Sequence, residues 1–205
     1  MTLKNYAIIF DLDGVLLDSE TNIFWMRQAL IDTLHDFNIE PTEENLSLLD
    51  TKNLSKFPQI AIYFGLDVKR LWKIRNAYYT KHKVEAILSE QITPFQDITA
   101  VSKIQNQAEL AILSNSPQEV VDVFRTHFQL ETIFPVGVGR SDRYEDIFKL
   151  KPHPLLWQKI KPFLDAKTIL YVGDRPSDKE FAEKTKMIFF GLNRYEQVFT
   201  NGCTS

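Results

Sequence analysis

Short runs of consecutive apolar residues recur along the chain, and polar positions do not alternate with apolar ones inside them. A half-exposed strand alternates apolar and polar residues, whereas a strand of a parallel sheet is buried on both faces and is apolar throughout. We therefore expect parallel strands at Tyr6–Phe10, Glu109–Ser114, Ile133–Val138, Thr168–Gly173 and Met187–Gly191.

The segments between the later runs carry apolar residues at helical spacing. One follows Ser116 and Pro117 and another follows His153 and Pro154, and proline favours the first turn of a helix. A third, shorter helix is expected around Phe181. Strands that alternate with helices predict an α/β fold with a doubly wound parallel sheet.

The long segment between the first and second runs contains no convincing strand, and its apolar residues follow helical spacing. We expect an all-helical insertion at residues 18–90 and an α/β core built from residues 1–17 and 91–205. The insertion leaves from the C-terminal end of the first strand, which is the edge where open α/β sheets bind ligands. A helical cap over that edge is the simplest geometry.

Composition and charge are those of a globular protein with a substantial core. The chain has 205 residues, of which 44% are hydrophobic and 25% charged, and its net charge is -3. This charge gives no reason to expect nucleic acid or an anionic membrane as a partner. No apolar run approaches the roughly 20 residues that span a bilayer, and the first residues do not read as a secretory signal. With Cys203 as the single cysteine, we expect a cytoplasmic protein without disulfides; the oligomeric state stays open.

Two aspartates, Asp11 and Asp13, follow the first apolar strand with one leucine between them. Carboxylates at the end of a dry strand lose hydration and repel each other, so both effects favour the neutral acid. A sequence that places them there is expected to supply a cation, or to use the strain chemically.

Other reactive side chains follow the later strands or the loops after them. Because the C-terminal ends of parallel strands lie at one edge of the sheet, these side chains are expected to converge with the first two aspartates. They are Ser114, Asn115, Lys151, Asp174 and Asp178.

The carboxylates in this set predict a magnesium site. Mg²⁺ prefers oxygen ligands at near-octahedral geometry. Asp11 and Asp174 can supply carboxylate oxygens, a backbone carbonyl near Asp13 can add a third ligand, and Asp178 can support the metal. Asp178 can alternatively cap the helix that follows it.

The remaining groups predict phosphoryl transfer. Ser114, Asn115, Lys151 and the loop N–H groups would bind the phosphoryl oxygens and stabilise charge in the transition state. Asp11 would attack phosphorus to give an aspartyl-phosphate. Asp13 would protonate the leaving alkoxide and later activate water, although an ordinary Asp titrates near 4 and needs local help to hold a proton.

These motifs resemble those of the haloacid dehalogenase-like hydrolase superfamily in order, spacing and strand position. They are "DLDGVLLDS" with Asp11 and Asp13, "LSNS" with Ser114, "KP" with Lys151, and "VGDRPSD" with Asp174 and Asp178. The resemblance spans Tyr6 to about Gly191. It implies a Rossmann-like core, a helical cap after the first motif, Mg²⁺ dependence and an aspartyl-phosphate intermediate. It favours the phosphoglycolate phosphatase-like branch, because the second aspartate of the phosphatases is present as Asp13.

Hydrolysis of a small phosphorylated metabolite is thus the expected reaction. A phosphosugar mutase of the β-phosphoglucomutase kind is one alternative, but the cap histidine of that family is replaced by Ile23. Phosphonatases use a cap lysine in a similar region, and none is present there. A catalytically degenerate member that binds a phosphorylated ligand or a protein is the other alternative.

Two departures from the resemblance leave questions open. Arg175 follows Asp174 where small residues are more usual, which would alter metal or phosphate geometry. The segment Gly139–Leu150 does not match the usual approach to the third motif, and its Arg140 and Arg143 either contact an anionic substrate or are surface charges. The identity of the substrate, and the cap residues that contact it, are not encoded in these patterns.

Overall fold

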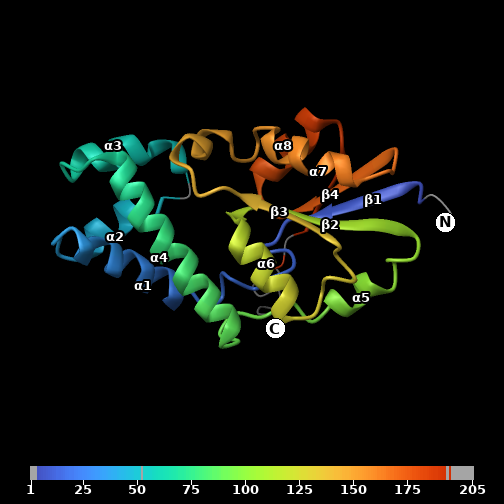
Figure 1. Cartoon of the computed structure of the whole chain (residues 1–205), viewed down its shortest axis with the longest axis horizontal. Helices are drawn as coiled ribbons and strands as arrows, with labels where there is room; N and C mark the ends of the chain where they lie inside the picture. Colours follow the sequence, from blue (N-terminus) through green and yellow to red (C-terminus); the bar gives the residue numbers. More distant parts are fainter. Residues whose placement is uncertain (1–3, 52, 193, 195–205) are drawn as a thin grey trace, which may run out of the picture.

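A five-stranded, entirely parallel sheet forms the centre of the α/β core in the computed structural model, which describes residues 4–51, 53–192 and 194 (Figure 1). The spatial order of the strands is β3-β2-β1-β4-β5. Their bounds are β1 Tyr6–Phe10, β2 Ala108–Pro117, β3 Val136–Arg140, β4 Thr168–Gly173 and β5 Ile188–Gly191. The strands run parallel at every junction, which confirms the doubly wound α/β fold.

Helices connect and cover these strands. The insertion after β1 contains α1 Phe24–Asp36, α2 Glu43–Leu49, the 3₁₀ turn η1 Leu54–Lys56, α3 Phe57–Tyr63 and α4 Val68–Leu88. The core contains α5 Ile98–Ser102, α6 Gln118–His127, η2 Tyr144–Lys149, α7 Leu155–Ile160, η3 Lys161–Phe163 and α8 Pro176–Thr185. Helices α1 to α4, called the cap below, lie together at one end of the molecule (left in Figure 1).

Three predicted strands differ from the structure at their ends, and the smallest difference is that β5 begins at Ile188 rather than Met187. The second strand continues through the expected helix start to Pro117, so Ser116 belongs to β2 and α6 begins at Gln118. The third strand begins at Val136 rather than Ile133. The N–H groups of Ile133 and Phe134 donate to the carbonyl of Leu130, at 3.0 and 2.8 Å, which closes a turn and buries the Phe134 ring.

The order of the strands sets the position of the site. From β1 the chain moves outward through β2 to β3, and then returns to the other side of β1 for β4 and β5. The direction of winding therefore reverses between β1 and β4, and a crevice opens outside the strand ends at such a switch point. Asp11 follows β1 and Asp174 follows β4.

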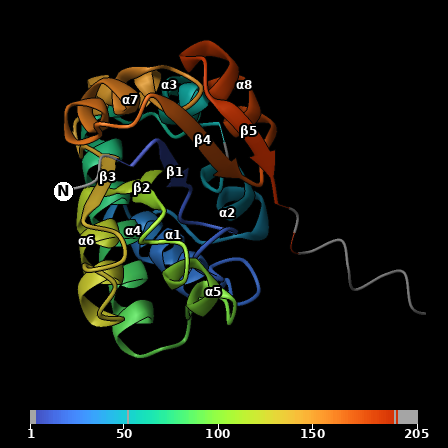
Figure 2. The ribbon, with the colours of Figure 1, turned by 90° about the vertical axis from the view of Figure 1, so that its right-hand side faces the viewer.

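Separate apolar clusters hold the two sheet faces and the cap. Helices α5 and α6 cover one face, through Ile98 and Phe124, and the cluster there also includes Ile87 from α4. Helices α7 and α8 cover the other face, through Leu156 and Phe181 (Figure 2). The cap has its own cluster around Trp72, which also includes Ile147 from η2 in the α/β core. Each face buries its own apolar side chains, and the cap is completed by a segment outside the insertion.

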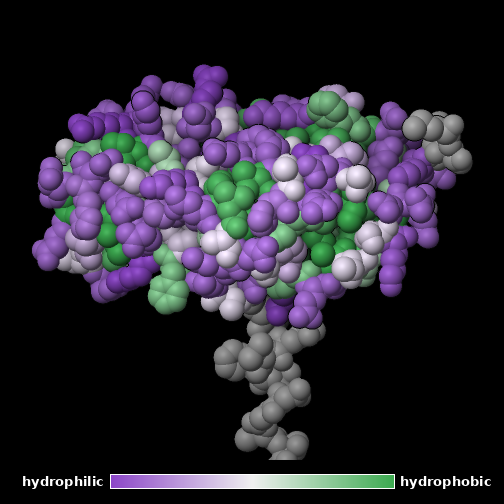
Figure 3. Space-filling model, turned by 60° about the horizontal axis from the view of Figure 1, so that its bottom comes forward, coloured by the Kyte–Doolittle hydropathy of each residue, from purple (hydrophilic) through white to green (hydrophobic). Residues whose placement is uncertain are grey.

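The outer surface is mixed in polarity. On the face drawn in Figure 3, apolar residues (green) gather in separate groups between hydrophilic ones (purple). None of the helices in the described part of the chain has the length and apolar character needed to cross a membrane.

Candidate active site

Three acidic side chains meet at the switch point of the sheet. One carboxylate oxygen each from Asp11, Asp174 and Asp178 lie within 4.8 Å of one another. Asp11 follows β1, Asp174 follows β4, and Asp178 lies in the first turn of α8. Gly14 allows the close approach of the two loops. Its φ is +75°, and a Cβ there would come within 2.4 Å of an Asp174 carboxylate oxygen.

Lys151 lies against this acidic cluster. Its Nζ is 3.0 Å from Oδ1 of Asp11 and 2.7 Å from Oδ1 of Asp178, and its side chain is 2% exposed. It also donates a hydrogen bond of 2.6 Å to the hydroxyl of Tyr171, which in turn donates to the carbonyl of Leu113 at 3.0 Å. Tyr171, a residue of β4, thus holds the Lys151 ammonium at this edge of the sheet.

One ammonium does not neutralise three carboxylates. Burial raises the pKa of Asp11 to about 6, with Lys151 opposing and Asp178 and Asp13 adding to the rise. Burial, and then the charge of Asp11, raise the pKa of Asp174 to about 7. Both carboxyls are therefore easier to protonate than an ordinary aspartate, and a further cation would favour their ionised forms.

Asp178 caps α8 and also pairs with Lys151, while its support of a metal stays a prediction. Its Oδ2 accepts a hydrogen bond of 3.1 Å from the N–H of Arg175, which caps α8, while its Oδ1 is the atom that pairs with Lys151. The Arg175 guanidinium pairs with Glu20 and lies 3.9 Å from Asp174. Arg175 therefore extends to the rim rather than into the acidic cluster.

Ser114 and Asn115 lie at the same edge, but in different roles. Ser114 is 1% exposed, and its hydroxyl accepts from the N–H of Ser116 at 3.2 Å. The Asn115 amide oxygen accepts from the Lys151 N–H at 2.9 Å, and its NH₂ group donates to the Lys151 carbonyl at 3.5 Å. In this arrangement Asn115 fixes the backbone of Lys151, and phosphate binding by Asn115 stays a prediction.

Asp13 is held by residues that the sequence analysis missed. Its Oδ1 accepts hydrogen bonds from Lys83 and from the Ser19 hydroxyl at 2.7 Å, and its Oδ2 accepts from the Ser116 hydroxyl at 2.6 Å. Lys83 comes from α4 in the cap, is 1% exposed, and also donates to Ser116 at 2.9 Å. The buried face of α4 carries several polar residues besides Lys83, so no signal in the sequence singles this lysine out.

These contacts decide the charge of Asp13. Burial alone would raise its pKa, but the Lys83 charge and the hydrogen bonds from Lys83, Ser116 and Ser19 outweigh burial and lower the pKa to about 2. Burial likewise opposes the charge of Lys83, but Asp13 outweighs it and raises the Lys83 pKa. The two groups form a charged pair, so the closed cap holds Asp13 in its basic form.

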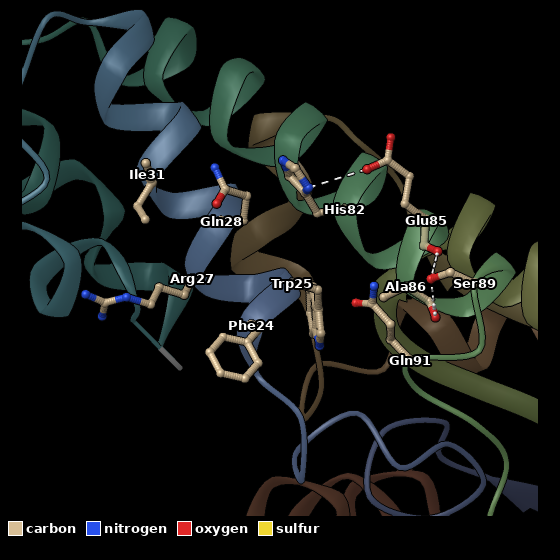
Figure 4. Close-up of a pocket in the computed structure, with 10 residues that line it drawn as sticks. All are labelled: Phe24, Trp25, Arg27, Gln28, Ile31, His82, Glu85, Ala86, Ser89 and Gln91. Carbon is tan, nitrogen blue, oxygen red and sulfur yellow. Dashed lines mark hydrogen bonds and ion pairs between the residues drawn. The ribbon is translucent and has the colours of Figure 1, made fainter.

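A separate hollow of about 460 Å³ lies on the outer side of the cap, between α1 and α4 (Figure 4). Its lining residues are Phe24, Trp25, Arg27, Gln28, Ile31, His82, Glu85, Ala86, Ser89 and Gln91. None of the predicted site residues lines it. The chemistry is therefore expected at the acidic cluster and not in this hollow.

The chain is similar to known proteins in both sequence and fold. The family model described as haloacid dehalogenase-like hydrolase matches residues 8–192. The chain is 24% identical over 182 residues to pyrophosphatase PpaX from Bacillus cereus (strain ATCC 10987 / NRS 248), covering 86% of this chain and 77% of that protein.

Solved structures share the fold. CbbY from Rhodobacter sphaeroides, in complex with phosphate, superposes with a TM-score of 0.67 at 16% identity, covering 97% of this chain and 92% of that one. A predicted phosphoglycolate phosphatase from Haemophilus somnus 129pt gives a TM-score of 0.64 at 21% identity, covering 93% and 85%.

Proposed function

Because the chain belongs to the haloacid dehalogenase-like hydrolase family, we propose that it is a Mg²⁺-dependent phosphatase that hydrolyses a small phosphorylated metabolite through an aspartyl-phosphate intermediate. The similarity to a protein named a pyrophosphatase, and the shared fold of a predicted phosphoglycolate phosphatase, support phosphorus as the reacting centre. The proposal assigns residues 18–90 to the cap and residues 1–17 and 91–205 to the catalytic core.

The observation that carries the proposal is the position of Lys151 against Asp11. A buried ammonium 3.0 Å from the nucleophile's carboxylate can bind an oxygen of an incoming phosphoryl group without leaving its other partner, Asp178. The Ser114 hydroxyl lies at the same edge of the sheet as a second donor. Fixed donors of this kind stabilise the charge that spreads over the phosphoryl oxygens in the transition state.

The acidic cluster fits a magnesium ion. Its donor atoms are all oxygen, as Mg²⁺ prefers. Oδ1 of Asp174 is buried with no hydrogen-bond partner among the described residues, and a bound ion would supply the partner that a buried oxygen normally has. Asp11 and Asp174 would hold the ion, with the backbone carbonyl of Asp13 and support from Asp178. When bound, the ion neutralises the cluster and the phosphoryl charge.

The chain's own residues then divide the reaction into two steps. An Asp11 oxygen attacks phosphorus, the bond to the leaving oxygen breaks, and the phosphoryl group is left on Asp11. In the second step a water oxygen attacks phosphorus, the bond to the Asp11 oxygen breaks, and phosphate leaves; Asp13, ionised beside Lys83, is the group placed to take the proton from that water. For Asp13 to protonate the leaving oxygen in the first step, the arriving substrate must separate it from Lys83, since that pair lowers the pKa of Asp13 to about 2.

The alternatives receive less support. Ile23 takes the place of the mutase histidine. It is 61% exposed, and its side chain has no group that could take part in acid–base chemistry, so the mutase hypothesis lacks its cap residue. Lys83 does bring a cap lysine to the site, but Asp13 holds it as an ammonium, and Schiff-base chemistry requires the free amine.

Phosphate release from p-nitrophenyl phosphate with Mg²⁺ tests the proposal, with wild type compared to Asp11→Asn. We expect release by wild type and a loss of at least about 10³-fold in the variant, because the variant has no nucleophile. Equal and negligible release from both would favour a degenerate, ligand-binding member. Isomer formation from a hexose phosphate without phosphate release would favour a mutase.

A further inference from the structure

Among residues 4–51, 53–192 and 194, two buried arginines at the contact between cap and core have no carboxylate partner. Arg75 lies on α4 and Arg140 ends β3, and each is 3% exposed. The Nε of Arg75 has no hydrogen-bond partner among the described residues. The only hydrogen bond from the Arg140 side chain in the described part of the chain goes from NH1 to the carbonyl of Ser141, at 3.2 Å.

This state is energetically costly. A buried guanidinium needs a paired charge or full hydrogen bonding to offset its lost hydration. Burial lowers the pKa of both arginines, that of Arg140 to about 10, and the positive charge of Arg75 adds to the effect on Arg140. The acidic groups that act on them, Asp50 and Asp142, do so at longer range than an ion pair.

Other buried cations of this chain are paired. Lys83 has Asp13, and Lys151 has Asp11 and Asp178. The lack of a carboxylate beside Arg75 and Arg140, within the part of the chain that the structure describes, is therefore a local property of this cluster.

Tyr79 connects the cluster to the reaction site. The guanidinium carbons of Arg75 and Arg140 lie 5.0 and 5.9 Å from the centre of its ring, and Nζ of Lys83 lies 5.5 Å from it. The Tyr79 hydroxyl is 3.4 Å from Nζ of Lys83, which binds Asp13. Arg140 also pairs in the sheet with Pro117, the residue after Ser116, whose hydroxyl donates to Asp13.

We propose that Arg75 and Arg140, beside the Tyr79 ring, bind a second acidic group on the leaving group of the substrate. This proposal rests on the proposed phosphatase function and makes the substrate class narrower: a phosphoryl compound whose leaving group carries a carboxylate or a second phosphate. With the phosphoryl group at Asp11 and the leaving oxygen towards Asp13, the remainder of the substrate faces Lys83 and Tyr79. Guanidinium groups bind carboxylate and phosphate through paired N–H donors, so both members of the class suit the site.

A matched pair of substrates isolates the second acidic group. 2-Phosphoglycolate and ethyl phosphate share the O–CH₂ link and differ by a carboxylate in place of a methyl group, and pyrophosphate tests a second phosphate. We expect wild type to prefer 2-phosphoglycolate or pyrophosphate over ethyl phosphate in kcat/KM. In Arg75→Met and in Arg140→Met this preference should fall by about 10- to 100-fold, the range for a charged hydrogen bond.

Arg70→Met is the matched control, because it makes the same substitution at an exposed position of α4 and should leave the preference unchanged. Arg75→Lys should recover part of the preference, which a general packing defect would not do. The inference is overturned if wild type has no such preference, or if the two Met variants lose activity equally towards ethyl phosphate and the acidic substrates.

A binding measurement separates this inference from the proposed function. On the Asp11→Asn chain, which should not turn over, 2-phosphoglycolate is expected to raise Tm more than ethyl phosphate does. Adding Arg75→Met should remove that difference. If wild type releases phosphate neither from these substrates nor from p-nitrophenyl phosphate, but the Tm difference is seen and is lost in this way, the phosphatase proposal fails and the anion site stands. If no difference is seen in the Asp11→Asn chain, the anion site fails whatever the activity.

Discussion

Replacing Lys83 with methionine gives the sharpest test of the link between cap and core. Methionine keeps a long apolar side chain and removes the ammonium, whose Nζ lies 5.2 Å from the centre of the Trp25 ring and 5.5 Å from that of Tyr79. Asp13 is then left with the hydroxyls of Ser19 and Ser116. A buried carboxylate that loses its counter-charge must remain unpaired or take up a proton.

The lowered pKa of Asp13 sets the size of the expected loss in the free energy of unfolding. It lies at about 2 against an ordinary 3.8, and with 1.36 kcal/mol per unit this difference contributes about 2 kcal/mol of stability at pH 7. Breaking a buried pair typically costs about 3–5 kcal/mol, and protonation of Asp13 limits that cost. We expect Lys83→Met to lose about 2–4 kcal/mol of the free energy of unfolding.

Urea denaturation of Lys83→Met, Asp13→Asn and the double variant at pH 7 measures the pair directly. The coupling free energy should be about 2 kcal/mol. Arg27→Met is the control, because it breaks the exposed pair with Glu43 and should change stability little. A coupling below about 0.5 kcal/mol would refute the assigned ion pair.

The stability contributed by ionised Asp13 should depend on pH in a defined direction. A carboxyl whose folded pKa is lowered stabilises the protein above its unfolded pKa and loses that effect as pH falls through the folded value. The Asp13 contribution should therefore be present above about pH 4 and disappear towards pH 2, and Lys83→Met should remove this pH-dependent part.

Further predictions concern the metal cluster and Asp13. In the folded protein the pKa of Asp11 is raised to about 6 and that of Asp174 to about 7, so without a divalent ion Tm should fall as pH rises from 4 to 7. Added Mg²⁺ should reverse this fall. A Tm unaffected by Mg²⁺ would count against the metal site. Gly14→Ala should weaken Mg²⁺ binding by at least about tenfold in calorimetry, because its Cβ would come within 2.4 Å of an Asp174 oxygen and its φ is +75°. Ser116→Ala removes one donor to Asp13 and should cost about 1–2 kcal/mol in urea denaturation; no change would mean that the hydroxyl makes no net contribution.

The sheet and the acidic cluster were predictable because both depend on local patterns. Apolar runs marked Tyr6–Phe10 and Thr168–Gly173 with the bounds that the structure has. Parallel topology then brought Asp11 and Asp174 to one edge, since strand ends in such a sheet converge whatever their distance in the sequence.

The surroundings of Asp13 were not predictable in the same way. Lys83 and Asp13 meet only because α4 packs over the core, and helical spacing does not say which core residue a buried lysine will reach. Ser116 was assigned to a helix start, whereas β2 extends through it and directs its hydroxyl to Asp13. The burial of Arg140 was unpredictable for the same reason. It depends on contact with Trp72 of the cap and not on the segment that carries Arg140.

Because η2 contributes to the apolar cluster of the cap, the cap cannot be separated from the core without exposing part of that cluster. Ile147 is 4% exposed and belongs to that cluster, yet it lies far along the chain from the insertion. Residues 18–90 expressed alone would leave this side of the cluster open to solvent. A chimera that exchanges the cap with that of a relative would therefore need to include residues 139–150 together with helices α1 to α4.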